Sequence, residues 1–316
     1  MVSEPVAKQK AKISVVIPAY NEEGNIRPVA DHLSKVLAEY SSYEIIFVDD
    51  GSQDRTLTEI KQARTSNPAV KYVSLSRNFG HQNALKAGLD LASGDCVISI
   101  DADMQHPPEL IRAIIAKWLE GFDIVYTIRI DDGLPFLKRA TSKMFYRLIN
   151  CLSDVEINEG AADFRLIDRK VADVFRRDIG EYYLFFRGLI SWVGFKQYAI
   201  AYRPNKRMFG GSKYSWRRMI SFALNGITSF SIKPLKISMA IGFLVSVLSF
   251  IYALYALYQH IFNGQTIAGW TSVIISVLFI GGIQMLLLGI LGEYVGKLFF
   301  ESKRRPHYIV RESDLS

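Results

Sequence analysis

Two acidic residues, Asp101 and Asp103, stand two positions apart directly after the apolar run Cys96–Ile100. A glycine before this run and prolines after it bound a segment that predicts a buried strand. In open α/β sheets, ligands bind beyond the carboxyl ends of the strands. Carboxylate oxygens at that position suit a Mg²⁺ or Mn²⁺ ion that carries phosphates. The alternative is a polar turn that caps the following helix, because Asp is a favourable N-cap residue.

Apolar runs alternate with segments of helical spacing over the first 130 residues. The predicted strands are Ile13–Ala19, Glu44–Val48, Lys71–Leu75, Cys96–Ile100 and Asp123–Ile128. The predicted helices are Asn25–Tyr40, Gln53–Ser66, Asn78–Ala92 and Pro108–Glu120. This alternation predicts an α/β fold with a mostly parallel sheet that helices cover on both faces. Acidic turns follow the strands, which places these side chains along one sheet edge: Glu22, Asp49, Asp50, Asp101 and Asp103.

The middle of the chain is less regular. Pro135–Leu152 has the pattern of a basic amphipathic helix, and Asp163–Ile167 has that of a short strand. Val171–Gly194 has helical spacing and carries an aromatic patch, and Lys196–Tyr202 predicts a last strand. The basic, glycine-rich sequence RPNKRMFGGSKYSWRR follows and is expected to be a mobile loop.

Two long segments near the C-terminus carry no charge. Ile237–Tyr258 has 22 such residues and Trp270–Gly292 has 23, and about 20 span the hydrocarbon layer of a membrane. The alternative is a pair of buried core helices. Lys and Arg flank the two segments on their outer ends and are absent from the connection between them. The positive-inside rule therefore places both ends of this hairpin in the cytoplasm, and the protein in the inner or plasma membrane.

The charge and cysteine content narrow the function further. The net charge is +7, and the basic residues cluster beside the apolar segments, which favours a membrane and phosphorylated substrates over nucleic acid. The alternating basic and apolar residues of Trp216–Lys233 indicate a helix that lies on the membrane surface. Only Cys96 and Cys151 are present, which favours a reducing compartment over a disulfide framework.

Several motifs together resemble a known enzyme family. PAYNEE (Pro18–Glu23), VDDGSQDRT (Val48–Thr56) and DADMQHPPEL (Asp101–Leu110) resemble the family 2 glycosyltransferases of the GT-A fold. Three further motifs resemble the branch that glycosylates polyprenyl phosphates: SLSRNFGHQNALKAGLDLASGD (Ser74–Asp95), NEGAADFRLIDR (Asn158–Arg169) and RMFGGSKYSWRRM (Arg207–Met219). The paired apolar segments and the ending EYVGKLFFESKRRPHYIV are most similar to its bactoprenol glucosyltransferase subgroup. Ala162 departs from the pattern, where glycine is expected before Asp-Phe-Arg.

The resemblance implies an inverting transfer of a hexose from a nucleotide sugar to a lipid phosphate. The subgroup implies glucose from UDP-glucose and undecaprenyl phosphate as acceptor, with polyprenyl-phosphate-glucose and UDP as products. The alternatives are mannose from GDP-mannose or another UDP-sugar. A different class of function is an inactive GT-A domain that serves as a membrane scaffold. The expected cofactor is Mg²⁺ or Mn²⁺, and the expected assembly is a homo-oligomer.

The resemblance also assigns roles to residues. Those expected to bind the nucleotide sugar are Pro18, Tyr20, Glu22, Asp49, Asp50, Asp101, Arg207 and Lys213. Those expected to hold the metal are Asp101, Asp103 and Gln105, and those expected in catalysis are Asp103, Asp163, Arg207 and Lys213. Those expected to meet the lipid phosphate are Arg129, Lys138, Arg139, Ser142 and Ser212. Independently of the resemblance, Arg77 and His81 are interpreted as structural residues at the start of a helix and are left out of the chemistry, and His106 is open between a metal ligand and a structural histidine.

These expectations divide the chain into five parts. Residues 1–12 form a flexible N-terminus without the apolar stretch of a signal peptide. Residues 13–213 form the cytoplasmic GT-A catalytic domain, and residues 214–234 the helix at the membrane surface. Residues 235–296 form the transmembrane hairpin, and residues 297–316 a basic cytoplasmic tail.

Overall fold

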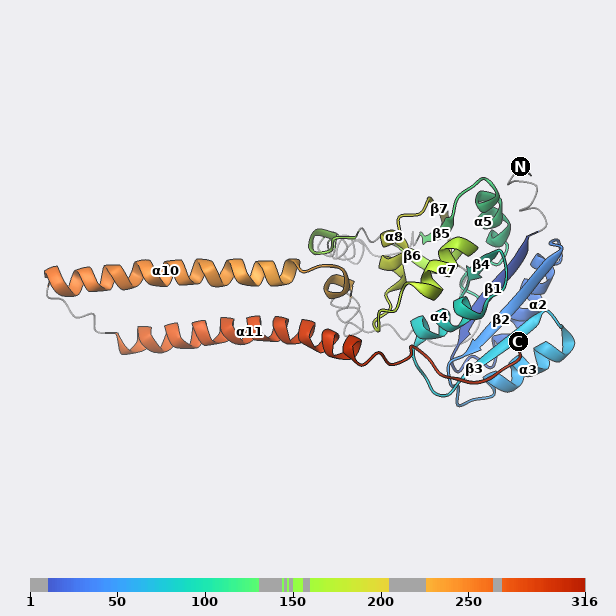
Figure 1. The fold of residues 1–316 in the computed structure, drawn as a ribbon, viewed down its shortest axis with the longest axis horizontal. Helices are drawn as coiled ribbons and strands as arrows, with labels where there is room; N and C mark the ends of the chain where they lie inside the picture. The colour runs from blue at the N-terminus through green and yellow to red at the C-terminus, as the bar shows by residue number, and fades with distance from the viewer. Residues whose placement is uncertain are drawn as a thin grey trace.

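The computed structural model describes residues 11–130, 144, 147, 150–155, 160–204, 226–263 and 269–315. In this part of the chain, one eight-stranded sheet lies between two layers of helices, and a pair of long helices projects from the domain (Figure 1). The strands are β1 (Lys12–Ala19), β2 (Ser42–Asp49), β3 (Val70–Leu75), β4 (Cys96–Ser99), β5 (Ile124–Arg129), β6 (Ala161–Asp168), β7 (Gln197–Tyr202) and β8 (Val310–Ser313).

The strand order is β7-β5-β6-β4-β1-β2-β3-β8. The central strands β4, β1, β2 and β3 are parallel, and β7 is parallel to β5. Strand β6 runs antiparallel to both of its neighbours, β4 and β5. The start of β6 therefore lies beside the carboxyl end of β4, at the edge where an open sheet binds its ligands. The predicted mostly parallel α/β sheet is confirmed.

Helices cover both faces of the sheet. They are α2 (Ile26–Leu37), α3 (Thr56–Ser66), α4 (His81–Leu91), α5 (Leu110–Leu119), α7 (Arg169–Arg177) and α8 (Phe186–Trp192). Val15 of β1 belongs to one buried core with Leu33 of α2 and Ile114 of α5. Its neighbour Val16 belongs to the other core, which contains Phe175 of α7. Because successive side chains of a strand point to opposite faces, an apolar strand such as β1 serves both cores.

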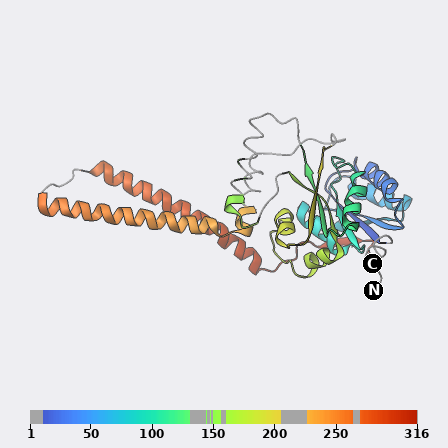
Figure 2. The same ribbon diagram turned by 90° about the horizontal axis from the view of Figure 1, so that it is seen from above.

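The two long helices, α10 (Lys233–Asn263) and α11 (Trp270–Ser302), run side by side away from the domain (Figures 1 and 2). Their apolar windows, Lys233–Ala256 and Val273–Ser302, are long enough to cross a membrane and are not buried in the protein. Met239, Phe243 and Met285 are each 72% exposed. Such exposure excludes the alternative of buried core helices, and surfaces of this kind mark contact with a membrane or another apolar partner.

The helix predicted over Val171–Gly194 is wrong, because two helices, α7 and α8, occupy this stretch. Helix α7 ends at Arg177, and the chain between the helices takes its hydrogen bonds elsewhere. The backbone N–H of Tyr182 donates to a carboxylate oxygen of Glu301 at 2.7 Å. A helix that ran on through Tyr182 would direct this N–H to its own preceding turn.

The last part of the chain returns to the domain. Helix α11 continues to Ser302, and β8 then pairs antiparallel with β3 at the edge of the sheet. Glu312 forms an ion pair with Lys61 at 2.8 Å. Residues expected to form a tail thus cover an edge that would otherwise present unpaired backbone groups.

Candidate active site

The loops that follow β1 and β2 are tied together at the carboxyl edge of the sheet. The backbone N–H of Asn21 donates to Oγ of Ser52 at 3.1 Å, and the N–H of Gln53 donates to Oδ1 of Asn21 at 2.9 Å. The N–H of Glu22 donates to Oγ1 of Thr56 at 2.8 Å. Asn21 has a φ of +54°, which Asn tolerates better than most residues. The predicted nucleotide-binding residues of both loops therefore belong to one connected structure.

Asp49 and Asp50 are buried, and each already accepts hydrogen bonds within the protein. Asp49 accepts from the N–H of Ser52 at 3.0 Å and from Oγ of Ser74 at 2.9 Å. Asp50 accepts from the backbone N–H groups of Phe79 and Gly80 at 2.7 and 2.9 Å. Burial raises the pKa of Asp50 although these two donors oppose the rise. Both aspartates thus shape the loops, and their contact with a nucleotide stays a prediction.

A glycine lets the loop after β2 approach the segment after β3. Gly51 has a φ of +68°, and a Cβ atom there would lie 2.4 Å from the backbone carbon of Arg77. Glycine alone meets both demands, because it adopts positive φ readily and has no side chain to clash. The start of α4, which carries His81, is thereby held against the loops that contain the acidic motifs.

Asp101 is oriented by a chain of polar side chains. Its Oδ2 lies 2.9 Å from Nε2 of His106, and Nδ1 of His106 lies 2.8 Å from the hydroxyl of Tyr202. A neutral imidazole that accepts from Tyr202 donates to Asp101. Burial alone would raise the pKa of Asp101, but His106 and His81 outweigh it and lower the pKa. His106 is buried and acts as the support for Asp101.

Asp163 is the most strongly charge-paired carboxylate of the site. Nη2 of Arg165 donates to its Oδ1 at 2.8 Å, and Arg187 reaches both of its oxygens at 3.4 Å. The Asp163 side chain is 13% exposed and that of Arg165 is 5% exposed. Burial alone would raise the pKa of Asp163, but Arg187, Arg165 and His81 hold it well below its usual range. Asp163 is therefore a permanent anion near neutral pH.

The carboxylates of Asp101 and Asp163 lie near each other. The antiparallel register pairs Ser99, the last residue of β4, with Arg165, and Oγ of Ser99 donates to the carbonyl of Asp163. Nε2 of His81 lies 3.7 Å from Oδ1 of Asp101 and 3.7 Å from Oδ2 of Asp163. His81 is 42% exposed, so the pair opens to solvent on this side. These groups form one charged centre at the carboxyl end of β4.

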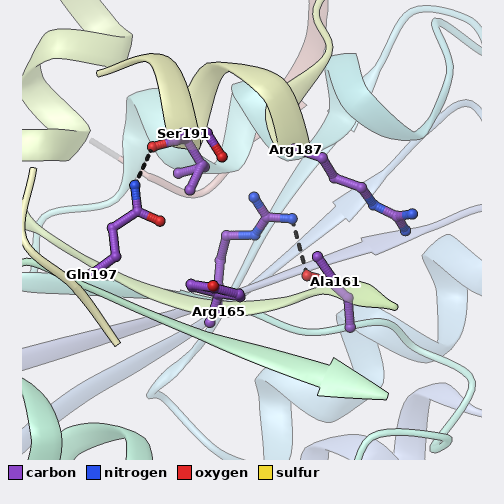
Figure 3. A pocket seen from close by; sticks show the side chains of 8 residues that line it. Ala161, Arg165, Arg187, Ser191 and Gln197 are labelled. Atoms are coloured by element: carbon purple, nitrogen blue, oxygen red, sulfur yellow. Dashed lines mark hydrogen bonds between the residues drawn. The ribbon is translucent and has the colours of Figure 1, made fainter. Parts of the chain in front are cut away.

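A cavity lies next to this centre. Arg165 of β6 points toward α8, whereas the side chain of Arg187 runs outward from α8, and both residues line the cavity (Figure 3). The remaining lining residues are Tyr126, Ala161, Ala162, Ile190, Ser191 and Gln197. Arg165 also donates to the carbonyl of Ala162 at 3.0 Å. Two of the residues that line this cavity, Arg165 and Arg187, are thus the residues that pair with Asp163.

The residues predicted to hold the metal suit an ion that takes its remaining ligands from the phosphates of a substrate. Oδ1 of Asp103 accepts from the N–H of Gln105 at 3.1 Å, across Met104 at a φ of +60°. The amide oxygen of Gln105 accepts from Arg129 at 3.3 Å. In the described ranges, no three His, Cys, Asp or Glu side chains converge on one point. Mg²⁺ is usually bound through one or two carboxylates and the substrate's phosphates, which suits Asp101 and Asp103.

The structure places the other predicted residues as follows. Pro18 is buried at the end of β1, and Tyr20 and Glu22 are partly exposed in the loop after it. Arg129 lies at the end of β5 and contacts Gln105. The remaining predictions lie outside the described residues: Lys138, Arg139, Ser142, Arg207, Ser212 and Lys213.

Sequence reasoning missed three contributors to the site, namely His81, Arg165 and Arg187. His81 and Arg165 belong to motifs that the resemblance singled out, NFGHQNAL and DFRLIDR. Arg187 lies 24 positions after Asp163 in an aromatic stretch, where nothing in the local pattern indicates an active-site arginine. The signal available for Arg165 was a charged side chain within an apolar strand, since a buried charge requires a partner.

Comparison with known proteins identifies the family of this chain. The family model for glycosyl transferase family 2 matches residues 14–175, and the model for the GtrB C-terminal hairpin matches residues 233–298. The chain is 44% identical over 302 residues to the uncharacterized glycosyltransferase YkcC of Bacillus subtilis, covering 95% of this chain and 93% of the relative. It is 42% identical over 305 residues to the bactoprenol glucosyl transferase of Shigella phage SfV, covering 95% of this chain and 98% of the relative.

Solved structures resemble the domain more distantly. Mannosyl-3-phosphoglycerate synthase from Rubrobacter xylanophilus matches 70% of this chain and 74% of its own, with a TM-score of 0.49 and 18% identity. Glucosyl-3-phosphoglycerate synthase from Mycobacterium tuberculosis, in complex with Mn²⁺, UDP-glucose and phosphoglyceric acid, matches 72% and 82%, with a TM-score of 0.48 and 20% identity. Likenesses at this level carry no argument about the site.

The sheet with its acidic carboxyl edge is the GT-A architecture of nucleotide-sugar-dependent glycosyltransferases. The chain belongs to glycosyl transferase family 2 and carries the hairpin found in its GtrB-type members. The expected family and fold class are thereby confirmed.

Proposed function

We propose that this glycosyltransferase transfers glucose from UDP-glucose to undecaprenyl phosphate, with inversion at the anomeric carbon. The observation that carries the proposal is the pairing of Asp163 with Arg165 and Arg187 opposite Asp101, in a domain that bears two exposed apolar helices. The match to bactoprenol glucosyl transferases over nearly the full chain supports the lipid acceptor and the glucose donor.

The chemistry requires no strong base. The nucleophile is an oxygen of the lipid phosphate, which is largely ionised at neutral pH because its second pKa is about 6. This oxygen forms a bond to the anomeric carbon while the bond from that carbon to the diphosphate breaks, and UDP leaves with the electron pair. Burial would raise the pKa of Asp163, but Arg187, Arg165 and His81 lower it, so we do not assign Asp163 the role of a base. Its role is to hold Arg187 in place, so that this guanidinium orients the acceptor phosphate.

Positive charge is needed where the diphosphate leaves. A Mg²⁺ or Mn²⁺ ion held by Asp101, Asp103 and Gln105 would neutralise the developing charge on UDP. His106 supports Asp101 in this role, whereas the Gln105 amide oxygen accepts from Arg129 and would have to exchange that hydrogen bond for the ion. Arg207 and Lys213 are proposed to close over the diphosphate, as the resemblance implies. Preorganised charges of this kind supply a large part of enzymatic rate enhancement.

The acceptor is proposed to arrive from the bilayer. Arg129, Lys138, Arg139, Ser142 and Ser212 are proposed to meet its phosphate, with α10 and α11 crossing the cytoplasmic membrane and both chain ends in the cytoplasm. The homo-oligomer stays a prediction. Open space around Gly281, Gly282 and Gly289 of α11 supports it, because small residues allow close packing between membrane helices.

The test is an assay of membranes that contain the protein, with undecaprenyl phosphate and a panel of UDP- and GDP-sugars. We expect transfer from UDP-glucose, with a β-linked product from the α-linked donor. Transfer from GDP-mannose alone would replace the donor by the alternative. Inactivity with every donor would favour the scaffold, although the intact cluster of Asp101, Asp103 and Asp163 argues against it.

A further inference from the structure

The last turns of α11 contact the segment that leads into α8. The ring of Phe300 stacks on Tyr182, with centroids 5.3 Å apart and planes 16° apart, and meets Tyr183 edge-on at 5.7 Å. The carboxylate of Glu301 accepts from the backbone N–H of Tyr182 at 2.7 Å. The helix that bears the apolar membrane surface therefore ends in an aromatic and polar contact with the catalytic domain (Figure 2).

The first turn of α8 follows this contact directly and is held on two more sides. Phe186 is buried and stacks on Phe175 of α7 at 5.2 Å with planes 7° apart. At Gly188 a Cβ atom would lie 2.5 Å from the ring of Phe230, which precedes α10. Arg187 extends from this turn, between those two residues. Packed side chains in such tight surroundings transmit displacements because they have little room to adjust.

Arg187 connects this turn to the reacting centre. Its guanidinium reaches both oxygens of Asp163 at 3.4 Å and is 22% exposed, whereas Arg165, the other partner of Asp163, is almost fully buried. Arg165 is fixed within the sheet through the carbonyl of Ala162. The position of Arg187 depends instead on α8, and hence on the contact that α11 makes ahead of it.

We propose that Phe300 and Glu301 are positioning residues for glycosyl transfer, which act through α8 on Arg187 and Asp163. In this proposal, the end of α11 positions active-site residues in addition to anchoring the protein. The inference rests on the proposed function, since it concerns the residues that orient the lipid phosphate. Displacing a catalytic group by about 1 Å can slow a reaction about 100-fold, so a modest shift of Arg187 is sufficient.

Two neighbouring phenylalanines provide a matched test. Phe300→Ala removes the ring that packs on Tyr182 and Tyr183, whereas Phe299→Ala removes a ring that is 55% exposed and packs edge-on against Phe300. Each variant is assayed as the full chain with undecaprenyl phosphate in membranes and with a short, water-soluble polyprenyl phosphate. We expect Phe300→Ala to lower kcat about tenfold with both acceptors, and KM for the nucleotide sugar to stay unchanged. Phe299→Ala is expected to match the wild type with the short acceptor.

A double-mutant cycle that combines Phe300→Ala with Arg187→Lys separates a positioning role from general destabilisation of the protein. If Phe300 acts through Arg187, Phe300→Ala slows the Arg187→Lys enzyme much less than it slows the wild type. Equal slowing in both backgrounds overturns the proposal, as does equal loss in the Phe299 and Phe300 variants with the short acceptor. Because Phe300→Ala affects packing, Glu301→Gln and Glu301→Ala form a second pair. We expect Gln, whose amide oxygen still accepts from Tyr182, to retain the activity that Ala loses.

The wild-type controls keep the two proposals distinct. An inactive wild type with both lipid acceptors removes the proposed function. An active wild type whose activity is indifferent to Phe300 and Glu301 removes only the positioning role.

Discussion

Arg165 donates to Asp163 at 2.8 Å from a side chain that is almost fully buried. A buried ion pair of this kind contributes less to stability than its charges suggest, because both groups lose their hydration. Its effect is to fix the charge state and direction of one carboxylate. Every role available to Asp163 in the reaction is therefore that of an anion.

The pH profile of the reaction should be independent of Asp163. Its folded-state pKa lies below the ordinary value of about 3.9, so its ionisation stabilises the fold above that pH, and this contribution is lost as the pH falls through the folded-state pKa. We expect the acid limb of kcat/KM to follow the lipid phosphate near pH 6. Asp163→Asn should lower the rate at least tenfold and leave the limb in place. A limb that moves with Asp163→Asn would identify this residue as the titrating group.

The acidic turn after β4 should be essential for chemistry and dispensable for membrane insertion. Asp103→Ala removes a carboxylate proposed to hold the metal, and we expect transfer to fall by more than 100-fold because the leaving diphosphate loses its counter-charge. Membrane fractionation should recover the variant in the amounts of the wild type. Full activity of the variant in buffer that contains a metal chelator would contradict a metal at this turn.

Gly51 should tolerate no side chain. Gly51→Ala combines a positive φ with a Cβ only 2.4 Å from backbone, whereas Gly121→Ala has a φ of +94° with nothing within 4 Å. Gly121→Ala serves as the control and should lower the free energy of unfolding by about 1–2 kcal/mol, because only the left-handed backbone conformation is unfavourable there. Gly51→Ala should cost more and weaken nucleotide binding, because the loop of Asp49 and Asp50 must move. Thermal unfolding and a UDP titration measure the two effects, and equal costs would show that the loop adjusts freely.

The returning strand β8 should influence the donor side of the site. Arg311 donates to Oγ of Ser74 at 2.8 Å and lies 3.9 Å from the buried carboxylate of Asp49. Since its side chain is 49% exposed, the attraction is screened. We expect Arg311→Gln to raise KM for the nucleotide sugar about threefold, in keeping with the ~0.6 kcal/mol of an exposed pair. Glu312→Gln, which alters only the pair with Lys61, is the control and should leave KM unchanged.

The sequence predicts the central sheet well because β1, β2 and β4 are buried on both faces and consist of continuous apolar runs. Strand β8 escaped prediction for the opposite reason. Its residues VRES alternate in no apolar pattern, and the strand exists because β3 offers an unpaired edge. The division of Val171–Gly194 depends on Glu301, which is 119 positions from Tyr182. Local spacing carries no information about such a partner.

For the candidate site, too, the residues that local motifs mark are predicted, and the partners that come from distant elements are not. Asp101, Asp103 and Asp163 follow from motifs. Asp101 and Asp103 come directly after β4, and Asp163 lies near the start of β6, which the antiparallel pairing of β6 with β4 brings to the same edge of the sheet. Their partners come from distant elements: Tyr202 reaches Asp101 through His106, and Arg187 reaches Asp163 from α8. Motif matching identifies the reacting groups, and only the fold reveals which charges hold them.

The hairpin and the strand that follows it contact the rest of the described structure at several places, and three of these contacts involve different elements: Lys233 of α10 donates to the carbonyl of Ser153, Glu301 of α11 accepts from Tyr182, and β8 joins the sheet. Three points define a plane, whereas a single linker would leave the domain free to tilt and swivel. With α10 and α11 in the membrane, as proposed, these contacts fix the height of the Asp101–Asp163 centre above the lipid surface. A lipid phosphate must then rise to a set height to react. Lengthening the connection between α11 and β8 should be tolerated. Lengthening α11 before Phe300 should instead carry the centre out of the acceptor's reach.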